Sequence, residues 1–376
     1  MIYLDNNATT RTDPEVLAAM VACSENFYAN PSSLHTPGQQ ARLSIDEARR
    51  QVARLINARP DEIVFTSGGT EADNLAILGS AQAMKGRRMG ILTSPIEHQA
   101  VLNPCRHLMQ LGHTVSNLSV DRSGAIPPES IAQAALGDFQ FVSVMSANNE
   151  TGVIQPIPEI VGMAKERKAL VHTDAAQAAG RIPLDVRALN IDLLTLSAHK
   201  FHGPKGIGAL FVRRGTPLAP ILFGGHHERH LRPGTENVPA IVGFGKACEI
   251  ALADLGKTSR YLCGLRDRFE QELRQNLPDI FINGETSYRL PNTSNLSVPG
   301  INGEMLCMNL DLLGVAISTG SACQAADDAP SHVLTAMGGT EEEARGAIRV
   351  SLSRYTTLEE IDQAVRFICQ VVGTLR

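Results

Sequence analysis

Short apolar runs alternate with helical stretches from about residue 15 to residue 250 of this 376-residue chain. The helical stretches, such as 100–111 and 157–167, have the spacing of amphipathic helices. The apolar runs predict strands at 62–66, 89–93, 139–145, 170–173 and 192–196. Such alternation is typical of an α/β fold, in which helices cover both faces of a largely parallel sheet. A further strand is expected at 206–213, at an edge or antiparallel.

The pattern changes after residue 239. A long helical region covers about 240–276, shorter strands are expected at 292–298 and 315–318, and a last amphipathic helix covers 358–375. These elements predict a second, α+β domain that begins near residue 250.

Composition narrows the class of protein. The hydrophobic content of 43% can fill a core, and the net charge of −5 comes without a basic block that would bind nucleic acid or an anionic membrane. No apolar run approaches the roughly 18 residues of a membrane span, and the N-terminus does not resemble a signal peptide. Seven irregularly spaced cysteines form neither a disulfide framework nor a zinc pattern. We expect a reduced, cytoplasmic enzyme without a metal.

Polar side chains follow several predicted strands. Ser67-Gly68-Gly69-Thr70 lies where a helix begins, a place suited to a phosphate. His98, Asn149 and Asp174 follow the next strands, and Lys200 follows the strand at 192–196. Because ligands bind beyond the carboxyl ends of parallel strands, these side chains are expected on one rim.

These residue types are the ones that pyridoxal 5′-phosphate requires. A lysine forms a Schiff base with its aldehyde, and an aspartate keeps its pyridine nitrogen protonated so that the ring withdraws electrons. Two other interpretations are weaker. The segment GPKGIG (203–208) lacks the order of a nucleotide-binding loop, and the histidines at 199, 202, 226, 227 and 230 form no H-E-x-x-H metal motif.

The chain resembles the NifS/IscS-like cysteine desulfurases, pyridoxal-phosphate enzymes of the class V aminotransferase group. The resemblance runs almost end to end. It is carried by YLDNNATT (3–10), NPSSLH (30–35), VFTSGGTEADNLAI (64–77), EHQAV (97–101), NNETGVIQPI (148–157), HTDAAQ (172–177), SAHKFHGPKGIGAL (197–210), GGHHERHLRPGTENVP (224–239), STGSAC (318–323) and RVSLSRYTT (349–357).

The resemblance implies a type I pyridoxal-phosphate transferase fold. Its large domain, residues 15–250, would contain a mostly parallel seven-stranded sheet, and residues 1–14 and 251–376 would form a smaller α+β domain. It further implies a homodimer that removes sulfur from L-cysteine. The products would be L-alanine and an enzyme-bound persulfide, which a protein sulfur acceptor receives.

The resemblance also implies residue roles. Lys200 would form the Schiff base, Asp174 would face the pyridine nitrogen, and His98 would stack on the ring and move protons. Further cofactor contacts would come from Asn149 and Gln177 at the phenolic oxygen, from Gly69, Thr70, Ser197 and His199 at the phosphate, and from Thr235 of the other subunit.

Substrate and sulfur would be handled by three more residues. Arg349 would pair with the substrate carboxylate, assisted by Asn30, and Cys323 would accept the sulfur. An aminotransferase or lyase on the same fold is the nearest alternative, but it has no need of a loop cysteine. A non-enzymatic regulator is a weaker alternative, because both the lysine and the cysteine are present. The acceptor, in iron–sulfur cluster assembly, tRNA thiolation or DNA sulfur modification, stays open.

Overall fold

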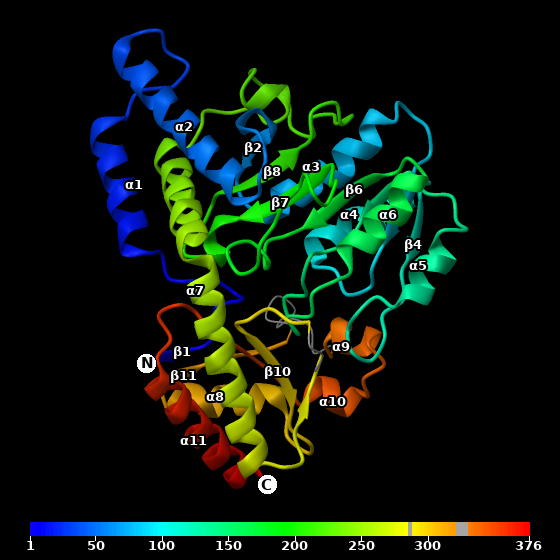
Figure 1. The fold of residues 1–376 in the computed structure, drawn as a ribbon, viewed down its shortest axis with the longest axis vertical. Coiled ribbons are helices and arrows are strands. Elements are labelled where there is room, and N and C mark those ends of the chain that lie inside the picture. Colours follow the sequence, from blue (N-terminus) through cyan, green and yellow to red (C-terminus); the bar gives the residue numbers. More distant parts are fainter. Residues whose placement is uncertain (285–287, 321–329) are drawn as a thin grey trace.

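The computed structural model describes residues 1–284, 288–320 and 330–376. Its main feature is a seven-stranded sheet in the order β2-β8-β7-β6-β5-β3-β4 (Figure 1). The strands are β2 (Ile63–Thr66), β3 (Gly90–Thr93), β4 (Thr114–Asn117), β5 (Phe141–Ser143), β6 (Leu170–Asp174), β7 (Leu193–Ser197) and β8 (Gly208–Val212). Only β8 runs antiparallel to its neighbours, so the predicted mostly parallel sheet of seven strands is confirmed.

Helices cover both faces of this sheet. One face packs against α1 (Pro14–Asn26), α2 (Thr36–Leu55), α5 (Pro128–Ala134), α6 (Ile157–Glu166) and the first part of α7 (Val238–Asn276). The other face packs against α3 (Gly69–Ala83) and α4 (Gln99–Gln110). Successive residues of a strand alternate between the two cores, as Val64 and Phe65 do. Burial on both faces explains why these strands are continuous apolar runs.

Two strands differ from the sequence-based expectation. β8 is antiparallel, as one alternative proposed, but it lies inside the sheet between β2 and β7 rather than at its edge. The edge strands are β2 and β4, and sequence reasoning missed β4. Its residues are TVSN, mostly exposed, so it lacks the apolar signal of the other strands.

A smaller group of elements encloses a second core. It contains a four-stranded antiparallel sheet in the order β12-β13-β10-β9 and a separate pair, β1 (Ile2–Tyr3) with β11 (Val315–Ala316). The four strands are β9 (Phe281–Ile282), β10 (Thr293–Ser297), β12 (Ser318–Thr319) and β13 (Ala347–Ser351). The strand expected at 315–318 is thus divided between two sheets. The helices here are α8 (Gly303–Leu312), α9 (His332–Ala336), α10 (Glu341–Arg345) and α11 (Leu358–Leu375).

The long helix α7 joins the two cores. Phe244 and Cys248 pack into the large core, whereas Leu262 and Phe269 pack into the small one. The transition between cores therefore falls within a continuous helix near the predicted domain boundary, and the division into domains stays a prediction. None of the described helices is both long and apolar enough to cross a membrane.

Candidate active site

A cavity of about 300 Å³ lies at the carboxyl ends of the parallel strands. One wall consists of the segments that follow β2, β3, β5, β6 and β7, and we call it the sheet wall. The other, which we call the opposite wall, consists of Asn7, Ala8, Gly320, His332 and Arg349. The cavity brings together ten residues predicted from the sequence: Gly69, Thr70, His98, Asn149, Asp174, Gln177, Ser197, His199, Lys200 and Arg349.

Lys200 closes a short 3₁₀ turn, Ala198–Lys200, directly after β7. Its Nζ donates hydrogen bonds to the carbonyl oxygens of Asn7 (2.8 Å) and Ala8 (2.9 Å). Its own carbonyl accepts a bond from Arg181 Nη2 at 3.1 Å. The N-terminal segment therefore helps to fix the direction of the lysine amine within the cavity.

The start of α3 forms a second part of the sheet wall. The backbone N–H groups of Gly69 and Thr70 lie in the first turn, where they have no acceptor within the helix. The turn before them packs tightly against β8, because a Cβ on Gly208 would come within 2.6 Å of the Gly68 backbone. Unpaired N–H groups at a helix N-terminus suit a phosphate group.

His199 borders the same region and is tied to the N-terminal segment through Thr9 Oγ1 at 3.1 Å. Burial, together with the nearby charges of Lys200 and Lys205, lowers its pKa to about 4. A histidine with so low a pKa is neutral at physiological pH. It would contact an anion as a hydrogen-bond donor rather than as a cation.

Buried carboxyl groups lie along the sheet wall: Asp73, Glu150 and Asp174 line the cavity, and Glu97 is buried in the segment that follows β3. Asp174 ends β6, is 8% exposed, and accepts a bond from the Ala176 N–H at 2.8 Å. Burial raises its pKa, although that hydrogen bond opposes the rise. Burial and the charge of Asp174 also raise the pKa of Asp73 and of Glu97 well above the ordinary range. A cationic ring nitrogen in this cavity would relieve the cost of charging Asp174.

Arg349 lies on β13 and is only 3% exposed, so it is not a solvent-facing member of an alternating strand. Its Nη2 donates to Asp5 at 2.8 Å and its Nη1 to the carbonyl of Asn149 at 3.2 Å. Its Nε, also buried, has no partner among the described residues. The guanidinium edge formed by Nε and Nη2 is therefore where a carboxylate can pair with it.

Three predicted residues lie elsewhere. Asn30 and Thr235 are exposed and do not line the cavity of this chain. Thr235 was expected to act in the other subunit's site, so its position at the surface accords with that expectation without testing it. Cys323 lies outside the described residues. Gly320, three positions before it in the sequence, lines the opposite wall.

The family model of the class-V aminotransferases matches residues 2–364 of this chain. The chain belongs to the class-V aminotransferase family. It is 47% identical over 376 residues to the cysteine desulfurase of Trichormus azollae, covering 100% of this chain and 94% of that protein. A solved NifS-like protein superposes with a TM-score of 0.93 at 39% identity over 99% of both chains. A structure described as SspA in complex with cysteine superposes with a TM-score of 0.83 at 36% identity, covering 95% of this chain and 100% of that chain.

The cavity fits pyridoxal phosphate, on which members of this family depend. It offers an amine, a buried carboxylate and a helix N-terminus, and its volume is that of a small-molecule site. Three of its lining residues carry buried polar atoms that have no hydrogen-bond partner among the described residues: Asp73 Oδ1, His332 Nδ1 and Arg349 Nε. Within the described parts of the chain, no group of three histidine, cysteine or acidic side chains converges on a metal position.

Sequence reasoning missed several residues of the site. Asn7 and Ala8 hold the lysine amine through backbone carbonyls, which leave no side-chain signal. Asp73 lies on α3 in the matched segment 64–77, and its acidic side chain on a buried helical face was the available clue. His332 had no signal of this kind, since it follows a stretch without apolar periodicity.

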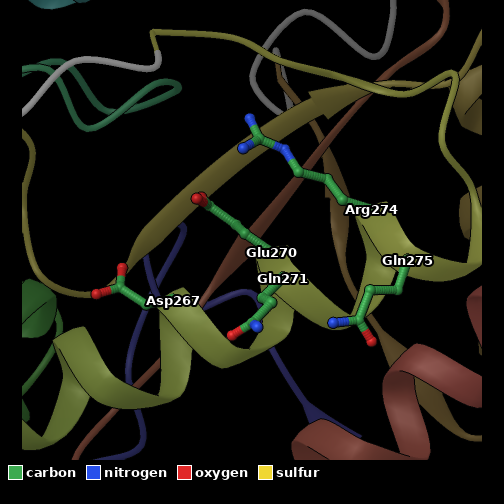
Figure 2. A pocket seen from close by; sticks show the side chains of 5 residues that line it. All are labelled: Asp267, Glu270, Gln271, Arg274 and Gln275. Carbon is green, nitrogen blue, oxygen red and sulfur yellow. The ribbon is translucent and has the colours of Figure 1, made fainter.

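A second hollow, of about 420 Å³, lies along the part of α7 that packs in the small core. Figure 2 shows its five charged or amide side chains, with Glu270 and Arg274 projecting from the same side of the helix. Glu270 pairs with Arg289 through two bonds of 2.8 and 2.9 Å. This hollow includes none of the residues that line the cavity at the strand ends.

Proposed function

We propose that this protein is a pyridoxal-phosphate-dependent cysteine desulfurase. It removes sulfur from L-cysteine, releases L-alanine, and keeps the sulfur as a persulfide on Cys323. The observation that carries this proposal is one cavity that joins Lys200, Asp174, a helix N-terminus and Arg349. End-to-end similarity to cysteine desulfurases supports the choice of cysteine as the substrate.

The sheet wall holds the cofactor in this proposal. Lys200 forms the covalent link, and Gly69, Thr70, Ser197 and His199 hold the phosphate. Asp174 faces the ring nitrogen, His98 lies against the ring, and Asn149 and Gln177 contact the ring oxygen. When bound, pyridoxal phosphate supplies an electron sink that acidifies the substrate Cα proton and weakens the Cβ–S bond.

Hydrogen bonds within the protein fix the orientation of some of these groups. Gln177 donates from Nε2 to the Asn7 carbonyl at 3.0 Å, and its Oε1 accepts a bond from the buried Arg181. Its amide is therefore held in one orientation, with one N–H left for the cofactor. The amine of Lys200, once released, is held near the substrate Cα and can take its proton.

The opposite wall recognises the substrate. Arg349 pairs with the cysteine carboxylate through its Nε and Nη2 edge, a geometry that lysine does not reproduce. The Cys323 thiolate then attacks the substrate sulfur. A thiol has an ordinary pKa of about 8.5, so the site must promote its ionisation.

We also propose a cytoplasmic homodimer that passes its persulfide to a protein acceptor. The loop before Thr235 carries Leu222 and Phe223, which are 47% and 79% exposed. Large exposed apolar side chains beside a residue expected to reach another subunit's site support a subunit interface there. The acceptor serves iron–sulfur cluster assembly, tRNA thiolation or DNA sulfur modification.

Product analysis tests the proposed reaction. Purified protein with pyridoxal phosphate, L-cysteine and dithiothreitol is expected to form L-alanine and sulfide in equal amounts. Formation of pyruvate and ammonia instead would indicate a lyase, and consumption of a keto acid as amino acceptor would indicate an aminotransferase. Neither alternative requires Cys323, so a matched Cys323→Ser protein would keep those activities.

A further inference from the structure

Three histidines line the cavity. His199 lies beside the start of α3, and the hydrogen bonds of the other two, His98 and His332, give those two opposite roles. His98 caps the N-terminus of α4, where its Nδ1 accepts the Ala100 N–H at 3.1 Å. An acceptor nitrogen has no hydrogen, so the proton of the neutral ring lies on Nε2. Burial lowers the pKa of His98, with Lys200 and His332 acting in the same direction and Asp174 against it. The cap uses the only lone pair of His98, which leaves an N–H to donate.

His332 has the reverse arrangement of acceptor and donor. Its Nε2 lies 3.0 Å from the carbonyl oxygen of Glu97, which can only accept, so Nε2 carries the proton of the neutral ring. Its Nδ1 therefore keeps a lone pair. That atom is buried, and no described residue bonds to it. His332 lines the same cavity as Lys200 and Arg349.

The position of His332 is fixed from two sides. Ser331 caps α9 and donates to Glu150 Oε2 at 2.5 Å, while the next residues, Val333 and Leu334, are buried in a small apolar core. Burial raises the pKa of Glu150, and a positive charge on His332 would oppose that rise. The residue before His332 is therefore tied to a buried carboxyl group that also lines the cavity.

We infer that His332 is a further catalytic residue, the base that takes the thiol proton of the substrate through Nδ1. This inference rests on the proposed function. A histidine nitrogen with a lone pair is the commonest general base in enzymes, and the lone pair of His98 is already used by the helix cap.

The step balances without another reagent. The substrate S–H donates its proton to Nδ1 while the Cys323 thiolate bonds to the substrate sulfur. The carbon–sulfur bond breaks, and its electron pair passes to carbon. The proton held on His332 then completes the methyl group. One cysteine and one enzyme thiolate thus give one alanine and one persulfide anion.

The test compares the holoenzyme with His332→Gln and His332→Ala. A glutamine amide can keep the donor to the Glu97 carbonyl but has no basic nitrogen. His107→Gln, the same change at an exposed position of α4, is the matched control. We expect His332→Gln to lower kcat with L-cysteine by about a hundredfold or more, with little change in KM, melting temperature or the cofactor absorption spectrum. In the His332→Gln protein, the rise of kcat with pH that reports deprotonation of a base should disappear.

L-selenocysteine separates proton transfer from a merely structural role, because its selenol is already ionised at neutral pH. His332→Gln should turn over L-selenocysteine at nearly the wild-type rate. An equal loss with both substrates, or an unchanged kcat and pH profile with cysteine, would overturn the inference while the desulfurase function stands. Absence of alanine and sulfide with the wild-type protein would instead overturn the proposed function and the inference with it.

Discussion

The two walls of the cavity differ in how the chain builds them. The sheet wall is made of short segments that each follow a strand, so neighbouring strands bring their ends together. The opposite wall is made of residues 7–8, Gly320, His332 and Arg349, which come from the two ends of the chain. Asn7 N–H, for example, donates to Ser351 Oγ at 2.9 Å across 344 positions. The first wall depends on one sheet, whereas the second depends on the packing of two cores.

The walls also differ in charge. The sheet wall carries the carboxyl groups of Asp73, Glu150 and Asp174, and burial raises the pKa of all three. The opposite wall has one buried arginine, Arg349, paired with Asp5. This difference suits a cationic ring on one side and a substrate carboxylate on the other. Substitution of Lys200 on the sheet wall should therefore lower turnover, whereas substitution of Arg349 on the opposite wall should weaken substrate binding.

Replacement of Lys200 gives the largest expected effect. Lys200→Ala should abolish alanine formation and remove the visible absorption that reports covalently held cofactor. Lys205→Ala, at an exposed position on the same loop, is the control and should keep both. Borohydride reduction followed by peptide mapping identifies the linked lysine. Cofactor fixed to a different lysine would contradict the assignment of the sheet wall.

Replacement of Arg349 should have a smaller effect of another kind. Arg349→Ala should raise KM for L-cysteine about ten- to hundredfold, because a charge-assisted hydrogen bond contributes about 1.5–3 kcal/mol. The absorption of the bound cofactor should persist. Arg214→Ala removes an exposed arginine that pairs with Asp61 and should leave KM unchanged. Loss of cofactor from the Arg349 variant with an unchanged KM would show that the two walls do not divide the tasks in this way.

The two walls also differ in how well the sequence predicts them. Lys200, Asp174 and Gly69 could be predicted because each follows an apolar run that ends at the rim of one sheet. The edge strand β4 was missed because exposed residues such as Ser116 and Asn117 give no apolar pattern. Lone pairs, helix caps and backbone acceptors depend on three-dimensional packing. The buried Nδ1 of His332, to which no described residue bonds, therefore could not be predicted.

The last predicted effect concerns stability rather than activity and is confined to the sheet side. His172 is fully buried on β6, where its ring bonds Ser143 Oγ at 2.8 Å and lies 3.5 Å from Asp73. Burial lowers its pKa from 6.5 to about 3. Between pH 6.5 and about pH 3 the unfolded chain therefore binds more protons than the folded chain. The free energy of unfolding falls as the pH falls through that window.

His172→Gln removes this contribution. The slope of unfolding free energy against pH should decrease by about 1.4 kcal/mol per pH unit within the window, as measured by urea unfolding. The exposed His107→Gln protein should keep the wild-type slope. An unchanged slope in the His172 variant would mean that another group causes the acid sensitivity of the sheet side.

The central claim is that sulfur leaves cysteine and is bound by Cys323. Mass spectrometry of the protein after brief exposure to L-cysteine and alkylation tests it most directly. We expect one extra sulfur atom on the peptide that contains Cys323, and none on peptides that contain the buried Cys23, Cys105 or Cys248. The Cys323→Ser protein should bind cysteine and carry no extra sulfur. A persulfide on another cysteine, with full alanine formation by the serine variant, would contradict the account.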